Sequence, residues 1–178
     1  MTNLLDSGRL EAKLIAPRHW RVSVADMVRN ALHSADTKGR AIDIDVADDL
    51  PTVITDPDLL ERVIANVVSN ACLFSPVDRP VRLTAGLTAT GIELLVIDHG
   101  PGTRDPRRRI PGASSEQSVT RVRDEDLALS VAEGFIKLLE GELRFDDTPG
   151  GGLTVAICLS AASAPASTIH VEESETLG

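Results

Sequence analysis

The feature that most constrains the fold is an amphipathic helix predicted to begin at Asp56-Pro57. Asp56 is a good helix N-cap and Pro57 suits the first helical position, while Pro76 stops the helix. Between these ends, apolar side chains recur at helical spacing and form one stripe: Leu59, Leu60, Val63, Ile64, Val67, Val68, Ala71 and Cys72. Such a stripe is typical of a helix that packs against a core.

Further helices and strands are predicted on both sides of this helix. Helices are predicted over residues 24–35, with Ser23 as N-cap, and over residues 124–140, with Gly141 as the stop. Apolar patterning bounded by turn residues predicts strands over residues 41–46, 81–87, 92–97, 142–145 and 153–159. Because regular βαβ alternation is absent, we expect an α/β (α+β) fold, a two-layer sandwich in which about three helices cover one face of a mixed sheet.

The remaining segments divide the chain into three parts. Residues 1–13 have a sparse apolar face and are interpreted as the end of a longer helix that docks elsewhere. Residues 14–160 form the predicted domain, and its long loop at 99–123 is rich in Gly, Pro, Arg and Ser. Residues 161–178 lack a core-forming pattern and are predicted to be a disordered tail.

Composition narrows the classes of function. A net charge of -9 over 178 residues argues against a general nucleic-acid binder. No apolar run approaches the roughly 18–20 residues of a membrane span, and the first residues lack the features of a signal peptide. We therefore expect a cytoplasmic domain, whose longer parent could be membrane-bound. Cys72 and Cys158 each have apolar neighbours and are interpreted as buried, reduced thiols.

Two groups of residues point to chemistry. Asn66 and Asn70 are one turn apart and share a helix face. A lone Asn at the margin of a core usually bonds only to nearby backbone. A pair is harder to explain in that way, because a carboxamide oxygen also suits Mg²⁺ carried on a nucleoside triphosphate.

The second group follows a buried strand directly and consists of Asp98, Gly100 and Gly102. An Asp at a strand end often only caps a turn. It can also accept a hydrogen bond from an exocyclic amine, while glycines allow a base or phosphates to approach the backbone. Alone, this pattern is weak.

Taken together, the two groups are specific. Residues 56–71, followed by residues 98–102, resemble the N box and the G1 box of sensor histidine kinases, which belong to the GHKL group of ATP-binding proteins. Residues 96–102 and 147–154 are most similar to the potassium-responsive KdpD branch of that family. The resemblance covers roughly residues 1–160. It implies a Bergerat-type α/β sandwich that uses ATP and Mg²⁺, and it makes residues 1–13 the end of a second dimerisation helix.

The resemblance also assigns roles to individual residues. It implies that Asp98 holds the adenine amine and that Asn70 binds Mg²⁺. It places Asn66 near the phosphates as the catalytic position. The other residues that it assigns to the nucleotide site are Ala71, Phe74, Gly100, Gly102 and Thr154. In related ATPases a water-activating Glu stands where this chain has Asn66. Because Asn cannot act as a general base, the site is suited to transfer rather than hydrolysis.

The implied activity is transfer of the ATP γ-phosphoryl group to a protein histidine. The histidines of this chain lack the pattern of the family's phosphoacceptor: His19, His33, His99 and His170. The expected partners are therefore a histidine-bearing dimerisation domain, in the same parent chain or another, and a response regulator.

Two departures from the family pattern keep alternatives open. The glycine-rich G2 box is replaced by residues 124–129, Asp-Glu-Asp-Leu-Ala-Leu. These carboxylates suit a helix start, but one carboxylate about 6 Å from a phosphate costs roughly 2–3 kcal/mol at an effective dielectric near 20. A mobile lid of loop arginines could compensate: Arg104, Arg107, Arg108, Arg109, Arg121 and Arg123. The second departure is Leu73, where the family usually has Lys or Arg.

The alternatives are two. The first is a degenerate, catalytically inactive GHKL domain that acts as a protein-interaction or regulatory module. The second is a serine kinase of the anti-sigma-factor type, which is less supported because residues 1–13 resemble a dimerisation helix.

Overall fold

A five-stranded sheet forms one layer of the structure, a computed structural model that describes residues 16–103, 110 and 127–160. The strands run in the order β2-β4-β5-β7-β6. Their bounds are β2 Ile42–Asp45, β4 Val81–Leu87, β5 Gly91–Ile97, β6 Glu142–Asp147 and β7 Leu153–Ser160. β2 pairs with β4 in parallel, and the other neighbouring strands pair antiparallel. The sheet is therefore mixed, as predicted.

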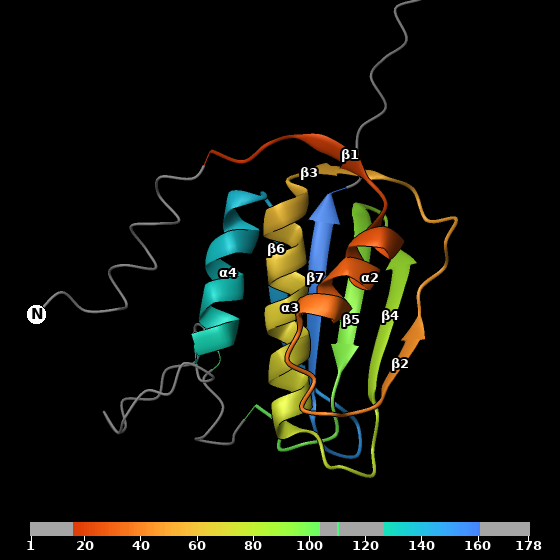
Figure 1. Ribbon diagram of the computed structural model, residues 1–178, viewed down its shortest axis with the longest axis vertical. Coiled ribbons are helices and arrows are strands. Elements are labelled where there is room, and N and C mark those ends of the chain that lie inside the picture. Colours follow the sequence, from red (N-terminus) through yellow and green to blue (C-terminus); the bar gives the residue numbers. More distant parts are fainter. Residues whose placement is uncertain (1–15, 104–109, 111–126, 161–178) are drawn as a thin grey trace, which may run out of the picture.

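Three helices cover one face of this sheet (Figure 1): α2 Val24–Ser34, α3 Pro57–Phe74 and α4 Ala128–Leu138. The core lies between the two layers, where alternate side chains of β5 (Ile92, Leu94 and Val96) are at most 1% exposed. α3 lies in the middle, packed against both other helices and against the central strands. The predicted arrangement of a mixed sheet and three helices is thus confirmed. In the described part of the chain, no helix is both long enough and apolar enough to cross a membrane.

Asp56 starts α3 and also fixes the incoming chain. Its Oδ1 accepts the backbone N–H groups of Asp58 at 3.0 Å and Leu59 at 3.2 Å, which confirms the predicted N-cap. Its Oδ2 accepts the N–H of Arg18 at 2.7 Å. Burial of this carboxylate favours its neutral form, but the three N–H groups outweigh burial and hold the pKa of Asp56 below its ordinary value.

α3 ends where the sequence predicts, and a residue far away in the chain caps one of its last carbonyl groups. The carbonyl of Cys72 would ordinarily accept the N–H of residue 76, and Pro76 has none. Arg40 supplies the missing donor, because its Nε lies 3.3 Å from the Cys72 oxygen. The loop between α2 and β2 is thereby tied to the last turn of α3.

α4 ends earlier than predicted and without a glycine in the left-handed region. Its last residue is Leu138, and Glu140 adopts a φ of 56°. The N–H groups of Glu140 and Gly141 then bond back to the carbonyls of Lys137 and Ile136, as in a Schellman motif. Gly141 is required for space, since a Cβ there would lie 2.7 Å from the Cys158 carbonyl oxygen. The predicted start at residue 124 lies outside the described residues.

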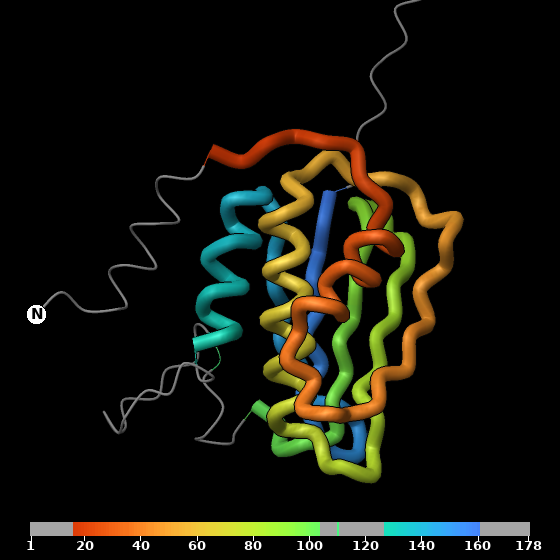
Figure 2. Tube along the Cα trace, in the orientation of Figure 1, coloured from red at the N-terminus to blue at the C-terminus, as the bar shows by residue number. Residues whose placement is uncertain are grey.

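Two short strands escaped the sequence analysis. β1 (Trp20–Val22) pairs antiparallel with β3 (Val53–Thr55) in a separate two-stranded sheet. Each strand has three residues, too few to show a period. They lie together at one end of the fold, where the N-terminal part of the described chain crosses it (Figure 2). The predicted segments 1–13 and 161–178 lie outside the described residues.

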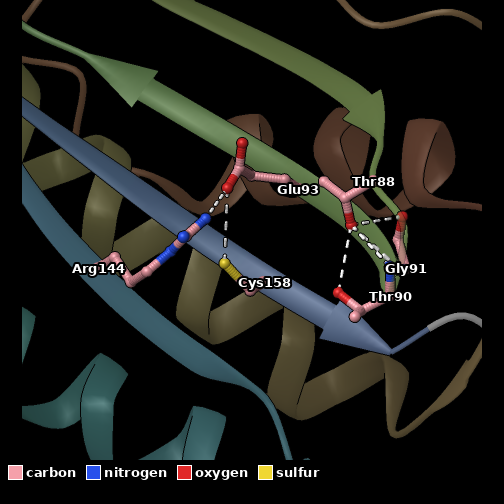
Figure 3. Close-up of polar contacts among 6 residues, drawn as sticks. All are labelled: Thr88, Thr90, Gly91, Glu93, Arg144 and Cys158. Atoms are coloured by element: carbon pink, nitrogen blue, oxygen red, sulfur yellow. Dashed lines mark hydrogen bonds and ion pairs between the residues drawn. The ribbon is translucent and has the colours of Figure 1, made fainter.

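The face of the sheet away from the helices carries polar side chains, as Figure 3 shows. Arg144 of β6 forms an ion pair with Glu93 of β5, and the Cys158 thiol points to the same carboxylate at 3.8 Å. Both cysteines are free, but only Cys72 is fully buried. The expectation of a buried thiol is wrong for Cys158, because residue 158 faces outward on β7. Burial in part still raises the pKa of Cys158.

Replacing Asp56 with Asn tests the hydrogen bonds that the Asp56 carboxylate accepts at the start of α3. The amide keeps one acceptor but presents an NH₂ group to a backbone donor, so a charge-assisted hydrogen bond worth about 1.5–3 kcal/mol is lost. At neutral pH we expect the melting temperature to fall by about 4–8 °C. Asp58→Asn is the matched control, since that carboxylate is exposed on the same helical turn.

The stability difference between the unmodified chain and Asp56→Asn should also depend on pH. Because the folded-state pKa of Asp56 is lowered, its stabilising contribution is complete above the ordinary value of 3.8 and is lost as the pH falls through the folded value. Thermal melts of the unmodified chain and Asp56→Asn should therefore converge as the pH falls toward about 2. A gap that stays constant with pH would contradict this account.

Candidate functional site

Three segments meet at one end of the sheet: the last turns of α3, residues 98–103 after β5, and residues 147–152 between β6 and β7. Figure 1 shows the carboxyl ends of α3 and β5 beside the start of β7. The Ser75 hydroxyl accepts the His99 N–H at 3.4 Å, which joins the first two segments. Asp98 and Leu153 join the second to the third through a backbone hydrogen bond of 2.9 Å. The N box and the G1 box are therefore brought together in space.

Backbone hydrogen bonds fix the side chain of Asp98 at this end of the sheet. Its residue is 1% exposed, and its Oδ1 accepts the N–H groups of Gly100 at 2.9 Å and Leu153 at 3.0 Å. Two backbone donors on one oxygen set the direction of the whole carboxylate. The side chain is thus held by the protein as an acceptor of known orientation, before any ligand binds.

The glycines of the site are required by the packing of the chain on itself. A Cβ at Gly100 would collide with the Phe74 carbonyl, and one at Gly102 with the Asp147 carboxylate. Gly152 has a φ of 124°, and a Cβ there would collide with the carbonyl of Asp98. The sequence analysis gave another reason, approach by a ligand. The observed reason is that three backbone segments lie in direct contact.

The two asparagines lie on α3 with their side chains unengaged by the described residues. Asn70 is 5% exposed and Asn66 is half-buried. Among those residues the structure records no hydrogen bond from either carboxamide. Ala71 and Phe74 continue the same face to the end of the helix, and the Phe74 carbonyl meets residue 100. Asn66 is one turn further from this junction than Asn70.

Thr154 lies beside Asp98 by strand register but already has a partner. It pairs with Ile97 across β5 and β7, and its hydroxyl lies 3.0 Å from that of Thr148. Thr148 is buried in the turn between β6 and β7. The hydroxyl pair therefore braces the base of the turn next to Asp98.

Asp147 is a residue that the sequence analysis missed. Its Oδ1 accepts the Thr103 N–H at 2.7 Å and fixes the direction in which the chain leaves residues 98–102. An Asp immediately before a Thr-Pro-Gly turn was the available signal. Leu73 is half-buried at the end of α3, whereas the loop arginines and residues 124–126 lie outside the described residues.

Cys72 is near this site but is not suited to act as a nucleophile. Burial raises the pKa of its thiol to about 11, and the charges of Asp36 and Asp98 act in the same direction while Arg40 opposes them. The thiol is therefore protonated at neutral pH. The chemistry available here is that of hydrogen-bond donors, acceptors and neutral oxygen ligands.

Substitution of Gly152 tests the contact between the third segment and Asp98. We expect Gly152→Ala to cost about 3 kcal/mol or more, because it adds both left-handed strain and a collision with backbone. Gly150→Ala is the control: it has a φ of 86° but nothing within 4 Å of the added Cβ, so about 1 kcal/mol is expected. Chemical denaturation measures both. If the two variants lost the same free energy of unfolding, the contact between residue 152 and Asp98 would not be as tight as the structure indicates.

Comparison with known proteins agrees with the geometry. Residues 55–163 match the family described as histidine kinase-, DNA gyrase B- and HSP90-like ATPase. The sensor protein KdpD of Mycobacterium tuberculosis is 37% identical over 179 residues, which cover 90% of this chain and 20% of that protein. The KdpD protein of Rathayibacter rathayi is 33% identical, with coverage of 93% and 20%. The chain thus spans about a fifth of the length of these curated relatives.

Solved structures share the fold. The mycobacterial sensor histidine kinase MprB has a TM-score of 0.63 at 23% identity, covering 80% of this chain and 97% of its own. Full-length ShkA, solved in complex with AMPPNP, has a TM-score of 0.67 at 23% identity, covering 89% of this chain and 35% of its own. With the family match over most of the domain and the Asp98 site at the end of α3, the chain belongs to the histidine kinase-, DNA gyrase B- and HSP90-like ATPase family, as the nucleotide-binding catalytic domain of a sensor histidine kinase.

Proposed function

We propose that this domain binds ATP with Mg²⁺ at the end of α3 and presents the γ-phosphoryl group to a histidine on another segment or chain. The observation that carries the proposal is the Asp98 carboxylate, fixed by two backbone N–H groups beside the last turn of a helix that presents two asparagines. An oriented acceptor and neutral oxygen ligands are the two kinds of group that a magnesium nucleotide requires.

The base is assigned to the Asp98 end of the site. A carboxylate accepts hydrogen bonds, so it selects the exocyclic amine of adenine and opposes the carbonyl that guanine carries at the same position. Ala71 and Phe74 supply the apolar surface next to residues 100–102, against which a planar ring would lie. Thr154 lies at the base of the neighbouring turn, with its hydroxyl shared with Thr148.

The phosphates are assigned to the asparagine face of α3. Asn70 offers a neutral oxygen to Mg²⁺, whose bound charge would offset that of the transferring phosphoryl group. Asn66 lies one turn earlier on α3, and we assign it a hydrogen bond to a phosphate oxygen. Since a carboxamide cannot take a proton from water, the residue at position 66 favours transfer over hydrolysis.

The partners follow from the length of the chain relative to its relatives. Because it corresponds to about a fifth of KdpD, the phosphoacceptor histidine is assigned to a dimerisation domain outside the described residues, in the same parent or in a partner. The phosphoryl group would pass from there to a response regulator. ATP and both of these partners are cytoplasmic, which assigns the domain to the cytoplasm.

A second candidate is a domain that keeps the fold without transfer. It is favoured by the sequence at the start of α4, where Asp124, Asp126 and Ala128 stand at the positions that carry glycines in related kinases. Leu127 makes no side-chain capping bond, and Leu73 gives no charge to a phosphate. Fewer donors would then face the triphosphate, and the domain would act by interaction alone.

Calorimetry with nucleotides tests the binding site. We expect MgADP and a non-hydrolysable ATP analogue to bind, with GDP at least about 100-fold weaker because its carbonyl meets the Asp98 carboxylate. Asp98→Asn should weaken MgADP about 10- to 100-fold, since a charge-assisted hydrogen bond is lost. Asn70→Ala should remove the advantage of MgADP over metal-free ADP. Asn30→Ala, on the exposed face of α2, should change nothing. Absence of heat and of any thermal shift at millimolar nucleotide would refute the site.

A phosphotransfer assay separates the two candidates. The chain is incubated with labelled ATP and the isolated dimerisation domain of the Mycobacterium tuberculosis relative, and acid-labile phosphohistidine is measured. We expect label on the histidine, reduced about 10-fold or more by Asn66→Ala because positioning of the phosphates is lost. Asn30→Ala, on the exposed face of α2, is the control. Nucleotide binding without any transfer would favour the inactive module.

A further inference from the structure

β2 is an edge strand of the five-stranded sheet, and its outer side is open. The strand order places β4 on one side of β2 and no strand on the other. Figure 1 shows β2 as the outermost strand, with no other labelled strand or helix alongside its free edge. An unpaired edge presents backbone donors and acceptors, and an extended segment of another chain can pair with them.

Alternation along β2 decides which of its backbone groups face the open side. The Val81 N–H bonds to the Ala41 carbonyl at 3.0 Å, and Val81 is in register with Ile42. In a parallel pair, a residue bonds to both neighbours of the residue opposite it, so Ala41 and Asp43 face β4. The N–H and C=O groups of Ile42 and Ile44 therefore point away from β4, to the side where the described residues contribute no strand.

The two faces of β2 differ in chemistry. Ile44 lies on the helix side of the sheet and is 52% exposed, although Leu83, its partner in register on β4, is fully buried. Asp43 and Asp45 are exposed on the opposite face. Among the described residues neither carboxylate forms an ion pair, even though Arg82 of β4 is in register with Asp43. β2 thus offers an apolar contact on one face and two negative charges on the other.

The other edge strand, β6, does not share this pattern. Its exposed residues Glu142, Arg144 and Asp146 include both signs of charge, and Arg144 is already paired with Glu93 of β5. Charges of mixed sign do not select an incoming strand of either sign. The charges on β2 are both negative, so they favour a basic strand.

A second copy of this chain is a poor occupant of the edge. If two β2 strands paired antiparallel about Ile44, Asp43 of each copy would lie directly opposite Asp45 of the other, at positions where facing side chains are closest. Like charges directly opposite each other are destabilising. The same carboxylates attract Lys or Arg, and the net charge of -9 adds a longer-range attraction for a basic segment.

We propose that β2 binds an extended segment of another protein in which apolar and basic side chains alternate. The segment pairs antiparallel with β2 and bonds to the N–H and C=O groups of Ile44. Its apolar side chains cover Ile44, and its Lys or Arg side chains lie opposite Asp43 and Asp45. The inference does not depend on nucleotide binding, because β4 and β5 separate β2 from the end of the sheet at Asp98.

Titration of the full chain with synthetic peptides tests the pairing. The probe is a capped peptide of sequence Thr-Lys-Val-Lys-Val-Lys-Thr. We expect it to bind about 10-fold or more tightly than the same peptide with glutamate in place of lysine. In the antiparallel arrangement the valine N–H groups point toward β2 and the lysine N–H groups point away. Methylation of the valine amides should therefore abolish binding, while methylation of the lysine amides, the matched control, should preserve it.

Two double variants test the acidic face of β2. Asp43→Asn with Asp45→Asn should weaken the lysine peptide about 10-fold, because two cross-strand charge pairs are lost. Glu142→Gln with Asp146→Asn is the control, since it makes the same change in net charge on β6 and should leave the affinity unchanged. All four positions are exposed, so the melting temperatures of both variants should stay close to that of the unmodified chain.

Three results would overturn the proposal. The first is absence of binding at millimolar lysine peptide, or equal binding of the two methylated peptides. The second is equal weakening by the two double variants, since overall charge alone would then attract the peptide. The third is dimerisation of the unmodified chain in sedimentation that competes with the peptide, because the occupant of β2 would then be a second copy.

Discussion

Burial of α3 between the sheet and its two neighbouring helices is the interaction on which the structure depends. Leu60, Val63, Ile64, Val67 and Val68 are all fully buried. Each such side chain contributes roughly 1.5–3 kcal/mol relative to exposure, so α3 alone accounts for much of the ordinary stability of a domain. On its α4 side, Arg62 lies 5.9 Å from the ring centre of Phe135 and extends the packing to the surface. Everything else is positioned relative to this helix.

Two buried aspartates join the ends of α3 to the rest of the chain in the same way. Asp56 accepts three backbone N–H groups at the start of the helix, and Asp98 accepts two beside its end. A carboxylate satisfied by backbone donors is held in one orientation, and it holds the donor segments in turn. At the first end the result is a fixed entry of the chain. At the second end it is an oriented acceptor close to the last turn of α3, where the adenine site is proposed.

The structure gives a different reason for the glycines of the site than the sequence does. In the sequence, Gly100 and Gly102 suit a loop that admits a ligand, and this role remains part of the proposed function. In the structure, each of them and Gly152 lies where a Cβ would strike a neighbouring segment. Close backbone packing therefore explains their presence whether or not a nucleotide binds. For this reason the asparagines and Asp98, rather than the glycines, carry the functional proposal.

The sequence by itself determined the parts that depend on local spacing. The cap at Asp56, the stop at Pro76, the apolar stripe of α3 and the main strands all follow from neighbours within a few residues, and they were predicted within one or two positions at most ends. The pairing of the Asn66–Asn70 helix with Asp98 also came from the sequence, through family resemblance. Tertiary structure alone decided the short pair β1 and β3, the support of the Cys72 carbonyl by Arg40, the outward position of Cys158 and the orphan hydroxyl of Thr55. Each of these depends on how segments far apart in the chain pack together, and local spacing in the sequence carries no record of that packing.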